Sequence, residues 1–211
     1  MIAILDYGLC NIGSVTNMLN YLGVANRVVG SSEALSRMET TGLILPGVGN
    51  FGRAMQALSK SGLGEVVHEA RAVGTPVLGI CLGMQMLARF SEEADCDGLG
   101  ILDAVVKKFS DEAEAIRIIP NMGWAPTKFV KGSALCNADL NRQRFYFVHS
   151  YHMVCKNRSD VLAVSRNGEF EFTAAVANGS VFGCQFHPEK SHRYGKKLLA
   201  NFAAHCASKH V

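Results

Sequence analysis

The first half of the chain alternates short apolar runs with segments in which apolar residues recur at helical spacing. The apolar runs predict strands at residues 2–5, 24–29, 43–45 and 77–80, and the periodic segments predict helices at 11–22, 51–58, 63–72 and 83–90. Strands that alternate with helices are joined by right-handed crossovers and therefore run parallel, with helices on both faces of the sheet. The pattern predicts an α/β fold on a mostly parallel central sheet.

The second half of the chain is richer in strands. Candidate strands lie at residues 105–109, 124–130, 145–148, 152–155, 161–165, 172–177 and 181–186, and a helix is predicted at 192–206. Asn178-Gly179 separates the last two strands and is a strong hairpin signal. Because no repeat or linker interrupts the pattern, we expect residues 1–211 to form one domain with an antiparallel, strand-rich C-terminal half.

Composition narrows the class of protein. Hydrophobic residues make up 48% and charged residues 18% of the 211 residues, as in an ordinary globular protein. The net charge of +3 without a basic block argues against nucleic-acid binding. No apolar run approaches the roughly 20 residues of a membrane span, and the start lacks a signal peptide. Seven cysteines without a C-x-x-C pair give no zinc signal. These features predict a cytoplasmic protein without a metal and without a membrane partner.

One cysteine occupies a position suited to nucleophilic catalysis. Gly79-Ile80-Cys81-Leu82-Gly83 joins a predicted strand to a predicted helix, and small residues on both sides of Cys81 permit a sharp turn. Such a turn exposes the sulfur at a helix N-terminus, where thiolates are stabilised, and aims the backbone N–H of Leu82 at an oxyanion. The alternative is a buried structural cysteine between two packing glycines.

A histidine and a carboxylate follow the last predicted strand. Pro188 forces His187 into an extended conformation at the strand end, and in an extended chain Glu189 points the same way as His187. A carboxylate beside an imidazole orients it and stabilises its protonated form. Sites in α/β sheets gather at the carboxyl ends of strands, where both Cys81 and His187 are expected. Together they predict a Cys81–His187–Glu189 triad; the alternative is a solvated turn.

A glycine-rich turn follows the third predicted strand. Gly47, Val48 and Gly49 let backbone N–H groups approach a ligand or allow a peptide to flip, so this loop is a candidate for a second oxyanion donor. A phosphate-binding turn is the rival interpretation. The G-x-G-x-x-G pattern that ends at Gly52 follows the third strand and lacks a clear acidic partner, so it does not indicate a dinucleotide site.

These motifs together resemble the class I, or triad-type, glutamine amidotransferases, and most closely the glutaminase subunits of imidazole glycerol phosphate synthase. The resemblance spans nearly the whole chain and is carried by the blocks LDYGLCNIGSV, LPGVGNFG, PVLGICLGMQML with SEE after it, YFVHSY and FGCQFHPEKS. It implies hydrolysis of glutamine to glutamate and ammonia without a cofactor. The implied nucleophile is Cys81, the general base and acid is His187, and its partner is Glu189.

The resemblance also implies a binding pocket and a partner. Val48, Gly49 and Leu82 would surround the oxyanion, and the residues matched to the glutamine pocket are Gln85, His149, Ser150 and Tyr151. The implied partner is a (β/α)8 barrel synthase subunit that uses the ammonia to form imidazole glycerol phosphate and AICAR in histidine biosynthesis. Residues matched to the docking face are Asn11, Ser14, Met122, Trp124, Tyr146 and Lys190. For Trp124 the alternative is an ordinary core position.

The chain departs from the family pattern near the expected docking face. The family usually has the sequence Pro-His-Met-Gly-Trp-Asn at residues 120–125. This chain has Asn121 in place of the histidine and Ala125 in place of the asparagine. In addition, Cys10 stands where a small residue is common. If Asn121 and Ala125 lie at the partner contact, the identity of the partner is open. The alternative function is the same chemistry feeding amidination of a nucleotide sugar in surface-polysaccharide synthesis. A non-catalytic binding protein and a cysteine peptidase or deglycase are less favoured, because the triad residues and the Phe-His-Pro-Glu ending are present.

Overall fold

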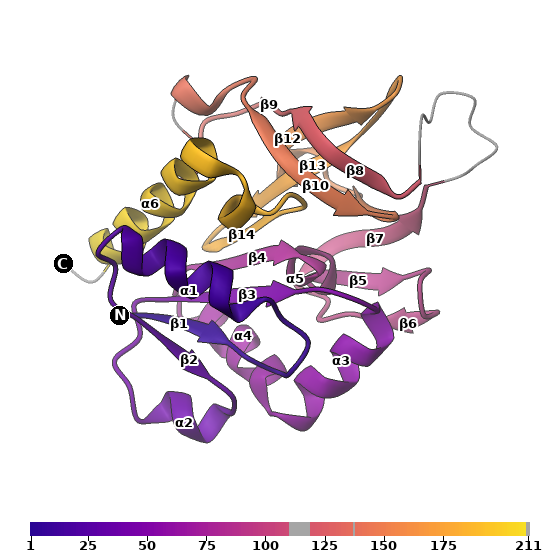
Figure 1. The fold of residues 1–211 in the computed structure, drawn as a ribbon. Coiled ribbons are helices and arrows are strands. Elements are labelled where there is room, and N and C mark those ends of the chain that lie inside the picture. The colour runs from indigo at the N-terminus through magenta and orange to yellow at the C-terminus, as the bar shows by residue number, and fades with distance from the viewer. Residues whose placement is uncertain (110–118, 137, 210–211) are drawn as a thin grey trace.

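A computed structural model of the chain describes residues 1–109, 119–136 and 138–209. The central sheet has the strand order β2-β1-β3-β4-β14-β13-β12-β9, and helices cover its faces (Figure 1). Strands β2, β1, β3, β4 and β14 pair in parallel, whereas β13, β12 and β9 continue the sheet antiparallel. The predicted α/β class with an antiparallel, strand-rich second half is confirmed.

The parallel strands are buried, which explains why they read as continuous apolar runs. They are β1 (Ile2–Leu5), β2 (Asn26–Val29), β3 (Gly42–Gly47), β4 (Val77–Cys81) and β14 (Val181–Cys184). Of these, only β2 at the sheet edge has exposed positions in its burial pattern.

Helices pack on both faces of this sheet (Figure 1). They are α1 (Ile12–Tyr21), α2 (Ser32–Ser36), α3 (Phe51–Lys60), α4 (Leu63–Ala72), α5 (Leu82–Met86) and α6 (His192–Ser208). Alternate residues of β1 supply the two cores. Ile4 packs in the cluster with α1 and α6, and Leu5 packs in the cluster with α3 and α4.

The remaining strands lie between α5 and β14 along the chain. They are β5 (Ala88–Ser91), β6 (Cys96–Asp97), β7 (Leu102–Lys108), β8 (Asn121–Pro126), β9 (Lys128–Phe129), β10 (Arg144–His149), β11 (Tyr151–Cys155), β12 (Val161–Asn167) and β13 (Phe170–Asn178). Short 3-10 turns are η1 (Ala138–Leu140), η2 (Arg158–Asp160) and η3 (Pro188–Lys190). The hairpin predicted at Asn178-Gly179 is confirmed: Asn178 pairs with Val181, and Gly179 has φ of 59°.

Two predicted elements were wrong in detail, and one helix was not predicted. The helix expected at 83–90 ends with α5, and the chain continues as β5, because pairing with β6 and β7 overrides the local helical pattern. The strand expected at 124–130 is split at Thr127, since β8 pairs with β10 and β9 pairs with β12. Helix α2 was missed; it is one short segment, and the Ser31 side chain caps it by accepting from Ala34 N–H.

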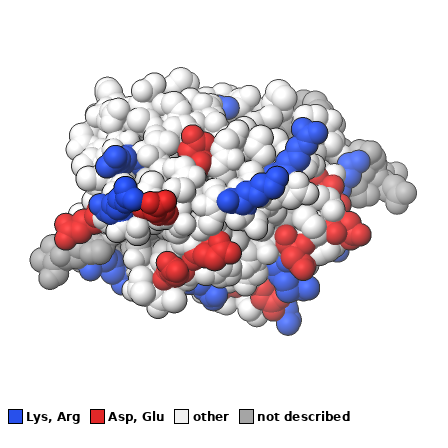
Figure 2. Space-filling model, turned by 90° about the horizontal axis from the view of Figure 1, so that it is seen from below, with Lys and Arg blue, Asp and Glu red and all other residues white. Residues whose placement is uncertain are grey.

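The surface seen from below mixes charges of both signs. Lysine and arginine side chains lie beside aspartate and glutamate side chains over this face (Figure 2). Arg37 and Glu33 form an exposed ion pair within α2 and its C-terminal end. Among the described residues, no helix combines the length and the apolar character that crossing a membrane requires.

Candidate active site

The turn between β4 and α5 holds Cys81 in an unusual backbone conformation. Cys81 has φ of 55° and ψ of −109°, which is rare for a residue with a side chain and indicates local strain. A Cβ atom at Gly83 would lie 1.8 Å from the carbonyl oxygen of Leu45, and one at Gly79 would lie 2.7 Å from that of Gly83. Glycine is therefore required on both sides of the nucleophile elbow.

His187 and Glu189 form a buried pair beyond the end of β14. The His187 Nδ1 atom lies 2.7 Å from Glu189 Oε1, and each side chain is 2% exposed. The backbone holds the histidine in place, because its N–H donates to Tyr146 O and the Ser191 hydroxyl donates to its carbonyl. The chain at Glu189 is not extended as expected: η3 turns there, and this turn brings the carboxylate back onto the ring.

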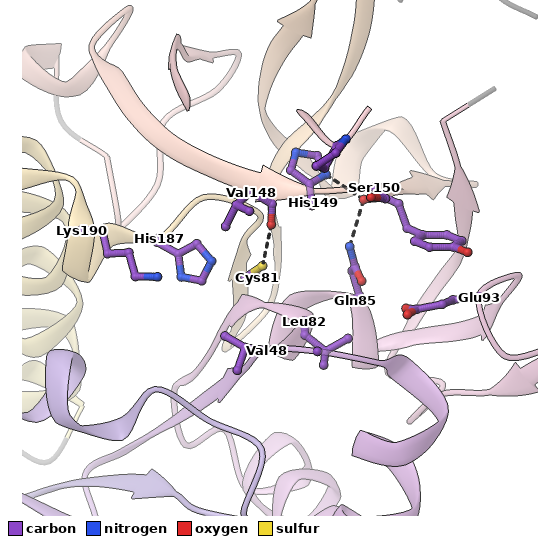
Figure 3. A pocket seen from close by; sticks show the side chains of 13 residues that line it. Val48, Cys81, Leu82, Gln85, Glu93, Val148, His149, Ser150, His187 and Lys190 are labelled. Atoms are coloured by element: carbon purple, nitrogen blue, oxygen red, sulfur yellow. Dashed lines mark hydrogen bonds between the residues drawn. The ribbon is translucent and has the colours of Figure 1, made fainter. Parts of the chain in front are cut away.

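Cys81 and His187 face each other across one cavity (Figure 3). They lie at the carboxyl ends of β4 and β14, which are adjacent parallel strands. Nε2 of His187 is buried and has no hydrogen-bond partner of good geometry in the described part of the chain, so it is free to exchange a proton at the sulfur. Nδ1 is held by the carboxylate, which orients the ring for that exchange.

The electrostatics of His187 favour a bound proton. Burial by itself lowers the pKa of this imidazole, but its interactions with Cys81 and Glu189 outweigh burial and raise the pKa to about 9. A histidine with a pKa near 9 retains its proton at neutral pH. It is therefore suited to protonate a departing amine.

The glycine-rich turn after β3 borders the same cavity. Gly49 has φ of 93°, and Val48 is 37% exposed. The Val48 N–H donates to the carbonyl of Leu9 at 3.1 Å, so it does not point a free donor at the cavity. The side chains of Val48 and Leu82 lie on one side of Cys81 (Figure 3).

The residues matched to a glutamine pocket line this cavity, which has a volume of about 320 Å³. This volume is at the small end of the range for small-molecule sites and suits an amino acid. The lining includes Gln85, His149, Ser150 and Tyr151. Burial lowers the pKa of His149 to about 3, so this ring is neutral at physiological pH.

Two polar residues at the site were missed. Glu93 lines the cavity, and its carboxylate accepts from the Asn50 side chain and from Phe51 N–H at the start of α3. Burial raises the pKa of Glu93. The sequence shows the SEE block that contains Glu93. Its position at the cavity depends on the preceding segment being strand β5, whereas the sequence predicted a helix there. Gln185 is fully buried and lies 3.7 Å from the Cys81 sulfur, and no local pattern marked it.

The predicted docking residues divide into exposed and partly buried positions. Met122 is 62% exposed and Trp124 is 37% exposed, so the core alternative for Trp124 is wrong. The Trp124 ring stacks on His192 with ring centroids 5.2 Å apart, and its edge meets Tyr146. Lys190 is exposed at the rim of the cavity, while Asn11 and Ser14 are partly buried at the start of α1 and hydrogen-bonded to each other.

The two departures from the family pattern do not lie where they were expected. Asn121 is 8% exposed and its side chain lies 2.8 Å from His149 Nε2. Ala125 packs against the hydrophobic core. Alternate residues of β8 face opposite sides, so Met122 and Trp124 point outward while Asn121 and Ala125 point inward. Among the described residues, no cluster of His, Cys, Asp and Glu could hold a metal ion.

Comparison with known proteins places the chain in one family. The family model for glutamine amidotransferase class-I matches residues 3–206. Imidazole glycerol phosphate synthase subunit HisH 2 of Pseudomonas aeruginosa is 45% identical over 96% of this chain and 98% of its own length. HisH 2 of Methanococcus maripaludis is 42% identical over 96% of this chain and 98% of its own length. HisH of Leptospira interrogans is 41% identical over 97% of this chain and its full length.

Solved structures share the fold at lower identity. A crystal structure of a glutamine amidotransferase superposes with a TM-score of 0.73 at 20% identity, covering 98% of this chain and 98% of that chain. The family match and the relatives agree along nearly the whole length. The chain belongs to the class I glutamine amidotransferase family.

Proposed function

We propose that this chain is a glutaminase that hydrolyses L-glutamine to L-glutamate and ammonia, acting as one domain, and passes the ammonia to a synthase subunit. The observation that carries the proposal is the placement of Cys81 and His187 at one cavity, with the imidazole held by the Glu189 carboxylate and aimed at the sulfur. A nucleophile, a base and an orienting group are the parts that covalent amide hydrolysis needs.

The chemistry follows from these positions. The Cys81 sulfur attacks the side-chain amide carbon of glutamine, a C–S bond forms, and the negative charge moves to the amide oxygen. His187 gives its proton to the nitrogen, the C–N bond breaks, and ammonia leaves a thioester. His187 then takes a proton from water, whose oxygen attacks the thioester and releases glutamate with the free sulfur. In this scheme Leu82 N–H is a donor to the oxyanion.

The cavity also offers recognition of the amino acid. Glu93 presents a carboxylate to the cavity, which suits the α-ammonium group of glutamine. Gln85 uses its Nε2 on protein acceptors, so its remaining oxygen is the atom available to a ligand. Ser150 and Tyr151 line the same cavity.

A partner is part of the proposal because the oxyanion loop is not ready for catalysis. Val48 N–H is occupied by Leu9 O, and turning it toward the cavity requires a rotation of the adjoining peptide. The peptide that carries this N–H joins Gly47 to Val48, and Gly47 has no side chain to restrict that rotation. We propose that a (β/α)8 barrel subunit docks over Met122, Trp124 and the neighbouring predicted interface residues, favours the rotated loop, and takes the ammonia away from bulk water.

The relatives named as HisH support imidazole glycerol phosphate synthase as the assembly. We propose that it works in histidine biosynthesis, in the cytoplasm. Both departures on β8 point inward, so they are not evidence against this partner. Complementation tests this pathway in a bacterial host that lacks its own HisH. When this chain is expressed there together with the synthase subunit from its own genome, we expect the host to grow without added histidine. Failure with a folded, complexed chain would reject this pathway.

A second candidate is glutaminase chemistry that feeds amidination of a nucleotide sugar. The observation in its favour is that two of the relatives carry the number 2 after the subunit name. Co-purification of the tagged chain from its host separates the candidates, because the synthase recovered with it is either the histidine enzyme or a sugar-modifying one.

Cys81→Ala tests the glutaminase proposal itself. We expect glutamate release by the complex to fall at least about 10³-fold, because covalent catalysis is lost, with the fold retained. Cys155→Ala is the matched control, since this partly buried thiol on β11 is not among the residues lining the cavity. Turnover that survives Cys81→Ala would rule out the thioester route.

A further inference from the structure

The sulfur of Cys81 has contacts that the triad does not explain. Its thiol lies 3.9 Å from the carbonyl oxygen of Val148, and Gln185 Nε2 lies 3.7 Å from the sulfur. A thiol can give its proton to a carbonyl, but an ionised sulfur beside that carbonyl is repelled. An N–H donor close to the sulfur offsets this repulsion. Gln185 is 0% exposed, so water does not compete for its amide.

The orientation of the Gln185 amide follows from a backbone carbonyl that is unable to donate. Gln85 Nε2 lies 3.0 Å from Tyr151 O, so the atom at that position must be the nitrogen. The same nitrogen lies 3.0 Å from Gln185 Oε1, which must then be an acceptor. The remaining end of the Gln185 amide, its NH₂ group, therefore faces Cys81.

The same carbonyl orders a second branch. His149 Nδ1 lies 2.7 Å from Tyr151 O and must donate to it. Because this histidine is neutral, its Nε2 accepts, and Asn121 supplies the N–H at 2.8 Å. A carbonyl oxygen has two lone pairs, so it satisfies both branches. The result is a continuous network from Asn121 on β8 to the nucleophile, with each of these donors matched to an acceptor.

We propose that Gln185 is a further catalytic group, which donates a hydrogen bond to the Cys81 sulfur and stabilises its ionised form, and that Gln85 positions it. The proposal deepens the glutaminase mechanism and rests on it for the identity of the substrate. Hydrogen bonds to charged acceptors are about twice as strong as those between neutral groups, so the donor acts mainly on the ionised sulfur. The titratable groups that interact with the sulfur are Tyr7, Cys184 and His187. Those that line the same cavity are Glu93, His149, Tyr151 and Lys190.

The test is the rate at which iodoacetamide alkylates Cys81, followed by peptide mass spectrometry across pH in the absence of glutamine. Gln185→Met keeps the length of the side chain and removes the donor. We expect alkylation at pH 7 to slow by about tenfold and the pH midpoint to rise by about one unit, with the rate returning to the wild-type value at high pH. Gln56→Met, on the outer side of α3 and away from the cavity, is the control and leaves the profile unchanged.

An unchanged profile for Gln185→Met, or a rate reduced equally at all pH values, overturns the proposal. If Gln185→Met does not fold, Gln85→Met provides the test, because losing the donor to Gln185 Oε1 releases the orientation of its amide; we expect the midpoint to rise, and an unshifted midpoint overturns the proposal. Since alkylation needs no glutamine, it remains decisive even if the wild-type complex hydrolyses no glutamine, which would reject the proposed function alone.

Discussion

At the scale of single residues, the site depends on where protons are held. His187 is almost fully buried, yet its pKa is raised to about 9 because the contributions of Cys81 and Glu189 exceed the effect of burial. His149, which lies in the aromatic cluster around Phe109 and Phe172, has its pKa lowered to about 3 by burial. Two histidines in one cavity thus carry opposite protonation states, and only the charged one has a carboxylate partner.

The raised pKa of His187 predicts a pH dependence of stability. A group whose pKa is higher in the folded state binds its proton more tightly there, so its contribution is complete below about pH 6.5 and is lost as pH rises toward about 9. Urea unfolding measures the difference in free energy of unfolding between the wild type and His187→Gln. We expect this difference to decrease between pH 6.5 and pH 9. A difference that stays constant or grows over this window would contradict the assignment.

At the scale of elements, the strand-to-helix turn and strand β8 matter most. The turn forces Cys81 into positive φ and depends on close backbone packing between β3, β4 and α5. Strand β8 separates two tasks on its two faces, since Asn121 contacts His149, which lines the cavity, and Trp124 reaches the surface. Each element makes a prediction that a local substitution tests.

Gly83→Ala should destabilise the fold by at least about 2 kcal/mol, because the new methyl would meet the Leu45 carbonyl and both groups are backbone-anchored. Chemical unfolding measures the change. Gly13→Ala in α1 is the matched control: nothing lies within 4 Å of its Cβ position, so we expect a gain of about 0.5–1 kcal/mol from helix propensity. Equal effects of the two substitutions would show that the turn tolerates a side chain.

Trp124→Ala should weaken the complex more than it weakens folding. An exposed tryptophan at the centre of a docking surface contributes about 2 kcal/mol or more to binding, or roughly 30-fold in Kd, whereas its loss here removes mainly the contacts with His192 and Tyr146. Calorimetry with the partner and urea unfolding of the lone chain give the two values. Val73→Ala, at a 78% exposed position after α4, should change neither. Comparable losses in binding and folding would reject the docking role.

At the scale of the whole molecule, the catalytic parts come from both halves of the chain and meet at one edge of the sheet. The sulfur comes from β4 and the imidazole from the end of β14, which lie side by side (Figure 1). The loop after β3 completes the cavity, but its Val48 N–H is held by Leu9. Activity is therefore coupled to whatever moves this loop.

The isolated chain should hydrolyse glutamine slowly, and the complex with its synthase should be at least about 10²-fold faster, since one oxyanion donor contributes about that factor. Coupled glutamate assays on both forms measure the ratio. A lone chain as active as the complex would show that the Val48 contact does not limit catalysis.

Local sequence determined much of this protein. Apolar runs and helical spacing predicted the parallel strands and most of the helices, Asn178-Gly179 predicted the hairpin, and the glycines around Cys81 predicted the elbow, because each of these depends on residues close in the chain. Tertiary structure decided the rest. Segment 88–91 became a strand because its pairing partners overrode its helical pattern.

The polar interior could be decided only in three dimensions. Gln185 and Cys81 are 104 positions apart, and the direction of the Gln185 amide depends on a carbonyl at Tyr151 that reaches it through Gln85. Nothing within a few residues of Gln185 encodes that carbonyl, because hydrogen-bond partners across a fold are chosen by distance in space. The sequence thus determined which groups can react, and the folded structure decided which hydrogen-bond donor or acceptor each of them contacts.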